Sequence, residues 1–302
     1  MKKGIKIYNL DSGKFEVEKV PAESFMRFLY ENPLGKIPLW SVFCRAWFSG
    51  LCGIWADSKA SAKAVGKFIT DNGIDASEFE KSPDSFRTFN DFFTRALRRG
   101  TRPVPFPENF KAVSFPADGR HLLVENIGES DFFYIKGQRF NLASFLGDEK
   151  LARRFFGGTM LVSRLSPADY HRFHYPINGR LCARKIINGL LYSVSPIALV
   201  RNISILWENR RVLNLVDSPD FGVCAFVEIG ATNVGGIVNF GGLDENVARG
   251  DVAGFFRFGG SCVATIFPQN CKIEFNPQLR KMSSCGMETY ARVNSLAGIL
   301  QV

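Results

Sequence analysis

At Lys111 the sequence pattern changes from one typical of helices to one typical of β-strands, and this change strongly restricts the possible folds. From there to the C-terminus, short runs rich in β-branched and aromatic residues alternate with Gly, Pro, Asn and Asp. Such runs are typical of β-strands joined by turns, and the lack of a fixed repeat argues against a propeller or a solenoid. The strand candidates are TMLVSRL, RKIINGLLYSV, RRVLNLV, GVCAFVEIGA, VGGIVNF and CVATIF.

The N-terminal third has a different pattern. It opens with a predicted β-hairpin, whose strands lie around residues 5–8 and 15–20. Residues 58–73 form an amphipathic pattern that Gly73 is expected to end as a C-terminal cap. We therefore predict an α+β protein in two parts: residues 1–105 hold the hairpin and membrane-associating helices, and residues 106–302 hold a predominantly β core.

The segment 37–56 is the most apolar in the chain and carries a single charge, Arg45. In a spanning helix that arginine would cost roughly 2.5–3.5 kcal/mol, and Gly50 and Gly53 would weaken the helix further. At 100° per residue the polar side chains share one narrow stripe, while Trp and Phe cover the rest, which favours a helix lying in a membrane interface. The alternative is a helical hairpin buried against the core or a second subunit. The stripe consists of Ser41, Arg45, Ser49 and Cys52.

Composition narrows the expected partners. The net charge of +9 favours an anionic partner, either nucleic acid or acidic lipid. No zinc-finger, RNP or other basic recognition pattern occurs, so a phospholipid surface is expected and nucleic acid is not. Seven cysteines without a C-x-x-C pair fit a reducing compartment better than a disulfide framework or a zinc site. No apolar segment follows the first basic residues, so no signal peptide is expected.

Candidate chemical groups are few, because the chain has three histidines. His171 and His174 lie in SPADYHRFHYP, and Asp118 lies in the turn of FPADGRH. In one hypothesis Asp118 orients His174, which acts as a base toward Ser261 in a nucleophile triad. In another, Asp118, His171 and His174 form a metal site of two histidines and one carboxylate. The residues alone leave both open, together with ordinary structural roles.

Ser261 follows two glycines in RFGGSCVATIF, where a strand is interrupted before a hydroxyl. A glycine pair within a strand marks a bulge, a tight bend or a distorted backbone. If it marks only a bulge, the chain could be a membrane-surface adaptor without chemistry.

Six segments, in order along the chain, resemble the motifs of the phosphatidylserine decarboxylase family, whose members depend on a pyruvoyl group. Two positions depart from the family pattern: Cys262 stands where Thr or Ser is usual, and Arg210 stands where the Asn-Glu-Arg-Val element has Glu. The segments are FPADGR, IKGQRFNLASFLGD, LSPADYHRFHYP, LWENRRV, VEIGATNVGGI and RGDVAGFFRFGGSCVATIF.

The resemblance implies that the protein cuts its own Gly260–Ser261 bond. The products would be a β chain, 1–260, and an α chain, 261–302, that carries a pyruvoyl group (covalently bound pyruvate) made from Ser261. This group would form a Schiff base with phosphatidylserine and release phosphatidylethanolamine. By position in the motifs, His174 and Asp118 would serve the cleavage, and His171 the decarboxylation.

The same resemblance implies the partners. The two chains would stay together as a heterodimer that dimerises further, bound to an anionic membrane surface. We expect a peripheral protein on the cytoplasmic side of the cell membrane. A decarboxylase of the same family acting on free amino acids or on another lipid is the nearest alternative.

Overall fold

The computed structural model describes residues 4–128, 140–232, 236–259 and 261–301. Helices precede most of the strands, so the expectation of a mixed fold with a large β part is confirmed. The helical segments are α1 (Glu23–Glu31), α2 (Lys36–Pro38), the π-helical η1 (Leu39–Phe43), α3 (Ala46–Asp57), the 3₁₀ segment η2 (Lys59–Ala62), α4 (Lys63–Asn72), the 3₁₀ segments η3 (Ala76–Glu78) and η4 (Pro83–Ser85), α5 (Phe89–Phe93), α6 (Leu142–Leu146), α7 (Glu149–Arg153), α8 (Pro196–Arg201), α9 (Ile205–Glu208) and α10 (Pro277–Ser284).

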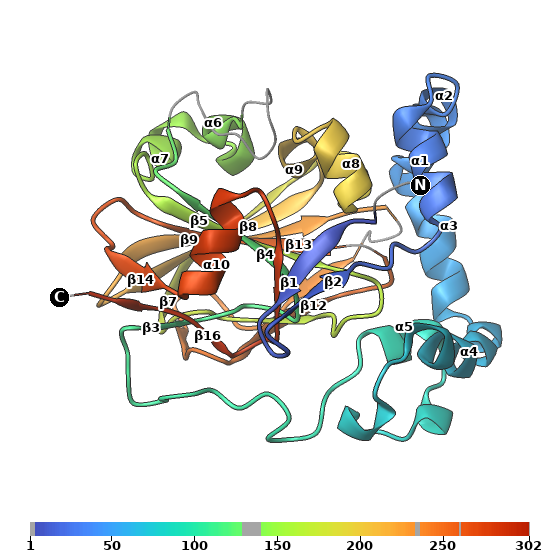
Figure 1. Cartoon of the computed structure of the whole chain (residues 1–302), viewed down its shortest axis with the longest axis horizontal. Helices are drawn as coiled ribbons and strands as arrows, with labels where there is room; N and C mark the ends of the chain where they lie inside the picture. The colour runs from blue at the N-terminus through green and yellow to red at the C-terminus, as the bar shows by residue number, and fades with distance from the viewer. Residues whose placement is uncertain (1–3, 129–139, 233–235, 260, 302) are drawn as a thin grey trace.

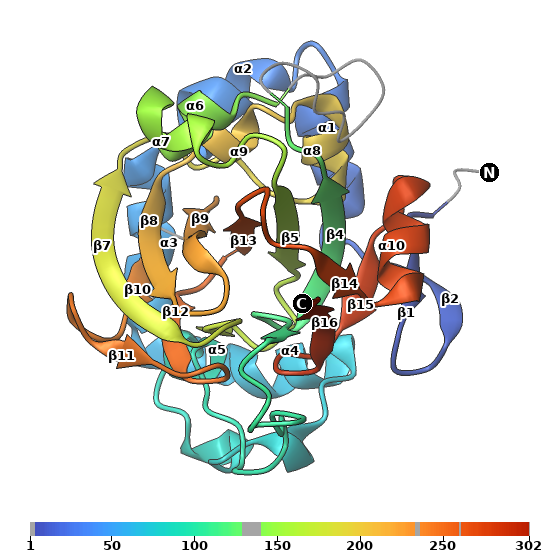
Figure 2. The ribbon, with the colours of Figure 1, turned by 90° about the vertical axis from the view of Figure 1, so that its left-hand side faces the viewer.

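The strands form one large sheet and two small ones, with orders β11-β7-β8-β9-β13-β5-β4-β15-β1-β2, β10-β12-β6 and β14-β16-β3. The large sheet curves, so that β7 and β4 lie on opposite sides of the core in Figure 2. The strands are β1 (Lys6–Asn9), β2 (Lys14–Val17), β3 (Ala112–Ser114), β4 (Gly119–Glu125), β5 (Thr159–Leu165), β6 (Arg172–His174), β7 (Gly179–Ile187), β8 (Arg211–Ser218), β9 (Gly222–Gly230), β10 (Ile237–Asn239), β11 (Asn246–Val247), β12 (Val252–Phe256), β13 (Ser261–Phe267), β14 (Ile273–Phe275), β15 (Thr289–Ala291) and β16 (Leu296–Leu300).

Strand β13 lies near the middle of the large sheet and is buried along its whole length. It pairs antiparallel with β5 on one side and β9 on the other. Cys262, Ala264 and Ile266 pack into one hydrophobic cluster, whereas Val263 and Phe267 pack into another on the opposite face. Burial on both faces explains why this strand has a nearly continuous apolar sequence. Ser261 is its first residue, at the edge of the core.

The predicted hairpin is formed by β1 and β2, but it extends the large sheet. Strand β1 pairs in parallel with β15, near the C-terminus, and β2 is the sheet's edge strand. The predicted helix cap is confirmed, because α4 ends at Gly73 with a φ of +63°.

The single helix expected over 37–56 is wrong. Two helical pieces, Lys36–Phe43 and Ala46–Asp57, meet at an angle of 66°. At the break, the Cys44 carbonyl accepts a hydrogen bond from Leu191 N at 3.0 Å, and Arg45 Nε donates to Trp40 O at 2.8 Å. These contacts replace bonds that a continuous helix would make internally. The polar stripe is lost as well, since Ser41 is exposed and Ser49 is buried.

The helices α1 to α3 form a column beside the sheet, with α4 and α5 at its lower end (Figure 1). None of the described helices is, by itself, both long and apolar enough to cross a membrane. The bent pair described above meets that criterion only when its two pieces are taken together, and only by length and composition.

Candidate functional site

Ser261 and His171 form the centre of the candidate site. The Ser261 side chain is fully buried, and its Oγ lies 3.2 Å from His171 Nδ1. Strand β13 fixes the serine, while the turn that precedes β6 carries the histidine. The structure therefore brings the nucleophile candidate to His171, whereas the sequence hypothesis placed His174 there.

The direction of this hydrogen bond follows from the second nitrogen of His171. Its Nε2 lies 3.1 Å from the Ser166 carbonyl, which can only accept, so Nε2 carries the proton. Burial, reinforced by the nearby Arg95 charge, lowers the pKa of His171 to about 3, so the ring is neutral at physiological pH. The Nδ1 lone pair then accepts the Ser261 hydroxyl proton, which is the geometry of a general base beside a nucleophile.

His174 and Asp118 have other partners. His174 Nδ1 donates to the Gly250 carbonyl at 2.7 Å, and its Nε2 lies 3.4 Å from the Tyr170 hydroxyl. Asp118 accepts from Arg102 Nη2 at 2.7 Å and from the backbone of Val293 at 2.7 Å. The expected hydrogen-bonded series Asp118–His174–Ser261 is thus not formed by these described residues. Which histidine serves which chemical step stays a prediction.

The residues of the hypothetical metal site also have other partners. Within the described ranges, no three His, Cys, Asp or Glu side chains are grouped so that they could hold a metal ion. Asp118 directs its carboxylate to Arg102, and His171 faces Ser261. The third histidine, His121, is buried in the core, where its Nδ1 meets the Ser163 hydroxyl at 2.8 Å.

Gly259, two residues before Ser261, adopts a backbone shape that favours glycine. Gly259 has a φ of +142°, a value that residues with a side chain rarely adopt. Gly260, the other half of the predicted cleavage bond, lies outside the described residues. The expectation that the glycines permit a distorted backbone holds at Gly259.

An apolar cavity of about 440 Å³ lies next to this site, although Ser261 and His171 do not line it. Gly259, Leu165 and Ser166 lie in its wall, and Leu165 is paired directly with Ser261 across the sheet. Its opposite wall comes from the helical column and from the segment that precedes Gly259. The aromatic residues that line the cavity are Phe25, Tyr30, Phe43, Phe48 and Phe258, together with Phe68 of α4.

Comparison with known proteins decides the family. The model of the family described as phosphatidylserine decarboxylase matches residues 89–289. The chain belongs to this family. A phosphatidylserine decarboxylase proenzyme of Fusobacterium nucleatum is 39% identical over 259 residues, 86% of each chain. Proenzymes of the same name from Clostridium kluyveri and Clostridium botulinum are 38% and 36% identical over 296 residues, covering 98% of this chain and 99% of theirs.

Family membership confirms the resemblance seen in the motifs. The protein is an enzyme, a decarboxylase of the lyase class, and its relatives carry the name proenzyme. It therefore belongs to phospholipid biosynthesis as a protein made in zymogen form.

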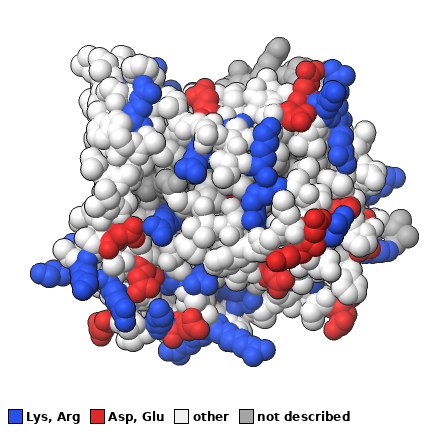
Figure 3. Space-filling model, turned by 180° about the vertical axis from the view of Figure 1, so that it is seen from behind, with Lys and Arg blue, Asp and Glu red and all other residues white. Residues whose placement is uncertain are grey.

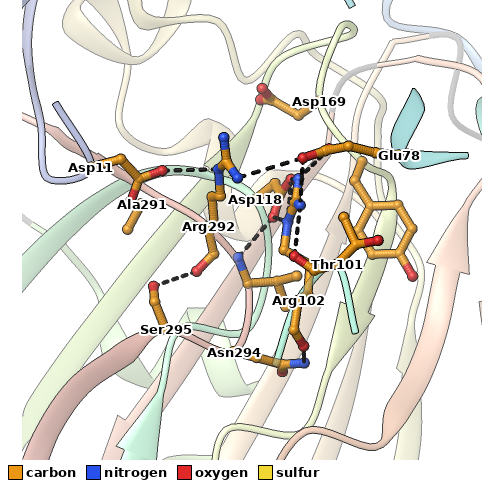
Figure 4. A network of polar contacts seen from close by, with 12 residues as sticks. Asp11, Glu78, Thr101, Arg102, Asp118, Asp169, Ala291, Arg292, Asn294 and Ser295 are labelled. Carbon is orange, nitrogen blue, oxygen red and sulfur yellow. Dashed lines mark hydrogen bonds and ion pairs between the residues drawn. The ribbon is translucent and has the colours of Figure 1, made fainter. Parts of the chain in front are cut away.

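In this decarboxylase, Asp118 belongs to an ionic network that ties the helical part to the sheet (Figure 4). Arg102 pairs with Asp118 at 2.7 Å and with Glu78 at 2.9 Å, and Glu78 also lies 3.5 Å from Arg292. Burial alone would lower the pKa of Arg102, but its hydrogen bonds to Asp118 and Glu78 raise it above its usual value. In the described contacts Asp118 pairs with Arg102, and its part in the cleavage stays a prediction.

Sequence reasoning missed the side chains that surround His171 in the decarboxylase. The Phe93 ring stacks on the imidazole with centroids 3.8 Å apart, and Arg95 Nη2 donates to the carbonyls of Ala168 and Asp169 in the turn before it. The available signal was the aromatic segment TFNDFFTR, which composition marked only as a cluster.

Cys262, one of the two departures from the family pattern, lies in the sheet beside the nucleophile. Its side chain is fully buried and belongs to the hydrophobic cluster on the face opposite Val263. Burial raises the pKa of its thiol to about 12, so it remains a neutral thiol at physiological pH. It therefore acts as a small apolar side chain and does not compete with Ser261 as a nucleophile.

Proposed function

We propose that the protein cuts itself before Ser261 and then converts phosphatidylserine to phosphatidylethanolamine with the pyruvoyl group that this cut produces. The observation that carries the proposal is the buried Ser261 hydroxyl, which donates to a neutral His171 beside an apolar cavity. Membership of a family of decarboxylase proenzymes supports both steps.

The self-cleavage begins at the serine oxygen. Ser261 Oγ attacks the carbonyl carbon of residue 260 while His171 Nδ1 takes the hydroxyl proton. The C–N bond breaks, which leaves an ester and a free amine at residue 261. Loss of the α proton and of the residue 260 carboxylate gives dehydroalanine, and water then replaces its nitrogen as ammonia. A pyruvoyl group remains at the start of β13.

The described residues around position 261 fit a pyruvoyl group. Its position is buried between β5 and β9, next to the neutral imidazole of His171 and to the cavity. When formed, the pyruvoyl group supplies a ketone that takes up the substrate amine and accepts the electrons released with carbon dioxide. His171 can hold or return a proton at Nδ1, and the stacked Phe93 excludes water from its face.

The two chains would remain associated after the cut. Strand β13, which begins the α chain, keeps its ladders with β5 and β9 of the β chain. Strand β15 likewise pairs with β1 and β4. These ladders support a stable heterodimer without a covalent link.

A lipid substrate fits the position of the cavity. Its wall includes the helical column, whose outer face exposes large apolar side chains, such as Ile54 with 71% exposure. Figure 3 shows this face, at the upper left, as mostly free of charged side chains. The cavity would hold the apolar part of the lipid next to the headgroup, and its end at Gly259 and Leu165 would direct the serine amine toward residue 261. The exposed large apolar residues of the column are Phe25, Phe28, Leu34, Ile37, Trp40, Trp47, Leu51, Ile54 and Trp55.

We propose that this face lies in the membrane interface, with the enzyme bound peripherally on the cytoplasmic side of the cell membrane. Trp and Phe side chains favour the interface, and Lys59, Lys63 and Lys67 are exposed directly after α3. Basic residues near an anionic surface contribute about 1 kcal/mol each to binding. The apolar cavity favours a lipid over a free amino acid as the substrate.

Intact mass spectrometry of the purified protein tests the proposal. We expect two chains, 1–260 and 261–302, the smaller beginning with a pyruvoyl group, and an uncut Ser261→Ala variant. Borohydride should trap phosphatidylserine on the smaller chain. A wild-type protein that persists as one chain without a reactive carbonyl refutes the proposal, and equal turnover of free serine refutes the choice of a lipid substrate.

A further inference from the structure

Asn90 in α5 holds the backbone just upstream of the cleavage bond. Its side chain is 5% exposed, and its Oδ1 accepts a hydrogen bond from Phe258 N at 2.7 Å. Its Nδ2 donates to Asp57 Oδ1 at 2.8 Å. The amide is thereby fixed in orientation, since Asp57 can only accept and the Phe258 N–H can only donate.

Asp57 also contacts the segment upstream of the cleavage bond directly, through Arg257. Its other oxygen lies 3.2 Å from Arg257 Nη1, one residue before Phe258. The Phe258 ring packs edge-on against Phe89 and Phe93 of α5, with centroids 5.0 and 5.4 Å apart. Backbone, side chain and charge contacts therefore converge on residues 257–258. We refer to the pair Asp57 and Asn90 as the upstream clamp.

The same short helix also holds the base. Phe93 stacks on His171, and Arg172 Nε donates to the Thr94 carbonyl at 3.1 Å just after the helix. Helix α5 thus links two segments that self-cleavage must bring together, although they lie more than 80 residues apart in the sequence.

The chemistry explains why such a clamp is needed. Attack requires the serine oxygen to lie about 3–3.5 Å from the carbonyl carbon, with the correct direction of approach. Strand β13 fixes Ser261 downstream of that carbon. Upstream, residues 259 and 260 are glycines, the residue type with the least restricted backbone, so the carbonyl of residue 260 is oriented only if the residues on both sides of the glycine pair are fixed. Phe258 is the first residue before them with a fixed backbone amide.

We propose that the upstream clamp, Asp57 and Asn90, positions the carbonyl of residue 260 for attack by Ser261, and that both are positioning residues for self-cleavage. This inference rests on the proposed function, because it concerns the rate of the cut that the proposed function requires. Neither residue touches the reacting atoms: Asn90 acts through the backbone of Phe258, and Asp57 acts through Asn90 and the Arg257 side chain.

An exchange of the two side chains tests the clamp. Asn90→Asp keeps the acceptor for Phe258 N–H but places two carboxylates together and removes the donor to Asp57. In the double variant, Asn90→Asp with Asp57→Asn, the amide stands at position 57 and the carboxylate at position 90. The amide at 57 can again donate a hydrogen bond to the side chain at 90, which still accepts from Phe258 N–H. We expect the single variant to cleave at least tenfold more slowly than wild type, and the double variant to return to within threefold of it.

The assay follows conversion of freshly translated full-length chain into its two products by mass. Val65→Ala is the matched control. Val65 is buried in the same hydrophobic cluster as Phe89 and Phe93, but none of the described hydrogen bonds or ring contacts to Phe258 involves it. It should cleave at the wild-type rate. Thermal unfolding of each change in the Ser261→Ala background should show intact folds.

Each failure has a distinct meaning. If wild type cleaves and Asn90→Asp cleaves equally fast, the clamp is refuted while the proposed function stands. The clamp is also refuted if the double variant remains as slow as the single one, or if Val65→Ala is equally slow. If wild type itself stays uncut, the proposed function is refuted and the clamp with it.

Discussion

Glu228 is a fully buried carboxyl group that the proposed chemistry does not use. It lies in β9 opposite Val263 of β13, and both of its oxygens lie 2.8 Å from Asn214 Nδ2. Burial raises its pKa from the usual 4.5 to about 8, against the opposing influence of hydrogen bonds from Asn239 and Asn214 and the charge of Arg184. The folded protein therefore keeps Glu228 protonated at neutral pH, whereas the unfolded chain ionises it.

This difference sets the sign of a pH effect on stability. The folded pKa lies above the unfolded one, so the stabilisation is complete below pH 4.5 and is lost as the pH rises toward about 8. Each pH unit inside that window costs up to about 1.4 kcal/mol, which gives about 3 kcal/mol at pH 7. A Glu228→Gln variant stays neutral, so it should escape this loss.

Urea unfolding of both proteins at pH 5, 6, 7 and 8 measures the effect, in the Ser261→Ala background so that one chain unfolds. The free energy of unfolding of Glu228→Gln minus that of the parent should rise by about 1 kcal/mol per pH unit. The shared groups cancel in this difference. Glu149→Gln, at an exposed position of α7 with 72% side-chain exposure, should show no such trend. A difference that stays constant from pH 5 to 8 refutes the reasoning.

Three further predictions concern the site and the membrane face. His171→Ala should slow self-cleavage by at least 100-fold in a mass time course, and His174→Ala by less, because His171 contacts Ser261; the reverse order would restore the motif-based assignment. Because the pKa of His171 is lowered to about 3, the wild-type cleavage rate should stay flat between pH 8 and 5, and a fall near pH 6.5 would contradict this. Trp47→Glu and added salt should each weaken binding to vesicles containing phosphatidylserine in a flotation assay, and binding insensitive to both would exclude the proposed interfacial face.

The strands and the ordered motifs could be predicted because they depend on neighbouring residues. TMLVSRL forms β5 over its whole length, and Gly73 ends α4 as its conformational freedom requires. The two glycines before Ser261 indicated an unusual backbone, and Gly259, the described one, has a φ of +142°. The candidate residues Asp118, His171, His174 and Ser261 were named from motifs, each of which is a local property of the chain.

The partners of those residues could not be predicted in the same way. His171 and His174 are three residues apart in an extended segment, so they face different surroundings, but the sequence does not say which surroundings lie on which side. The fold of β6 against β12 turns His174 toward Gly250 and leaves His171 beside Ser261. Asp118 likewise pairs with Arg102, because the loop between α5 and β3 passes next to it in the fold.

The sequence by itself determined the family, the strand-rich core and the serine that follows two glycines, since these are read from residue type, period and order. Only the tertiary structure decided which imidazole meets that serine, where the apolar helix breaks, and that Asn90 holds Phe258. Each of these is a contact between segments far apart in the chain. Local sequence limits what each segment can contact, but the packing of all segments selects the partner that it meets.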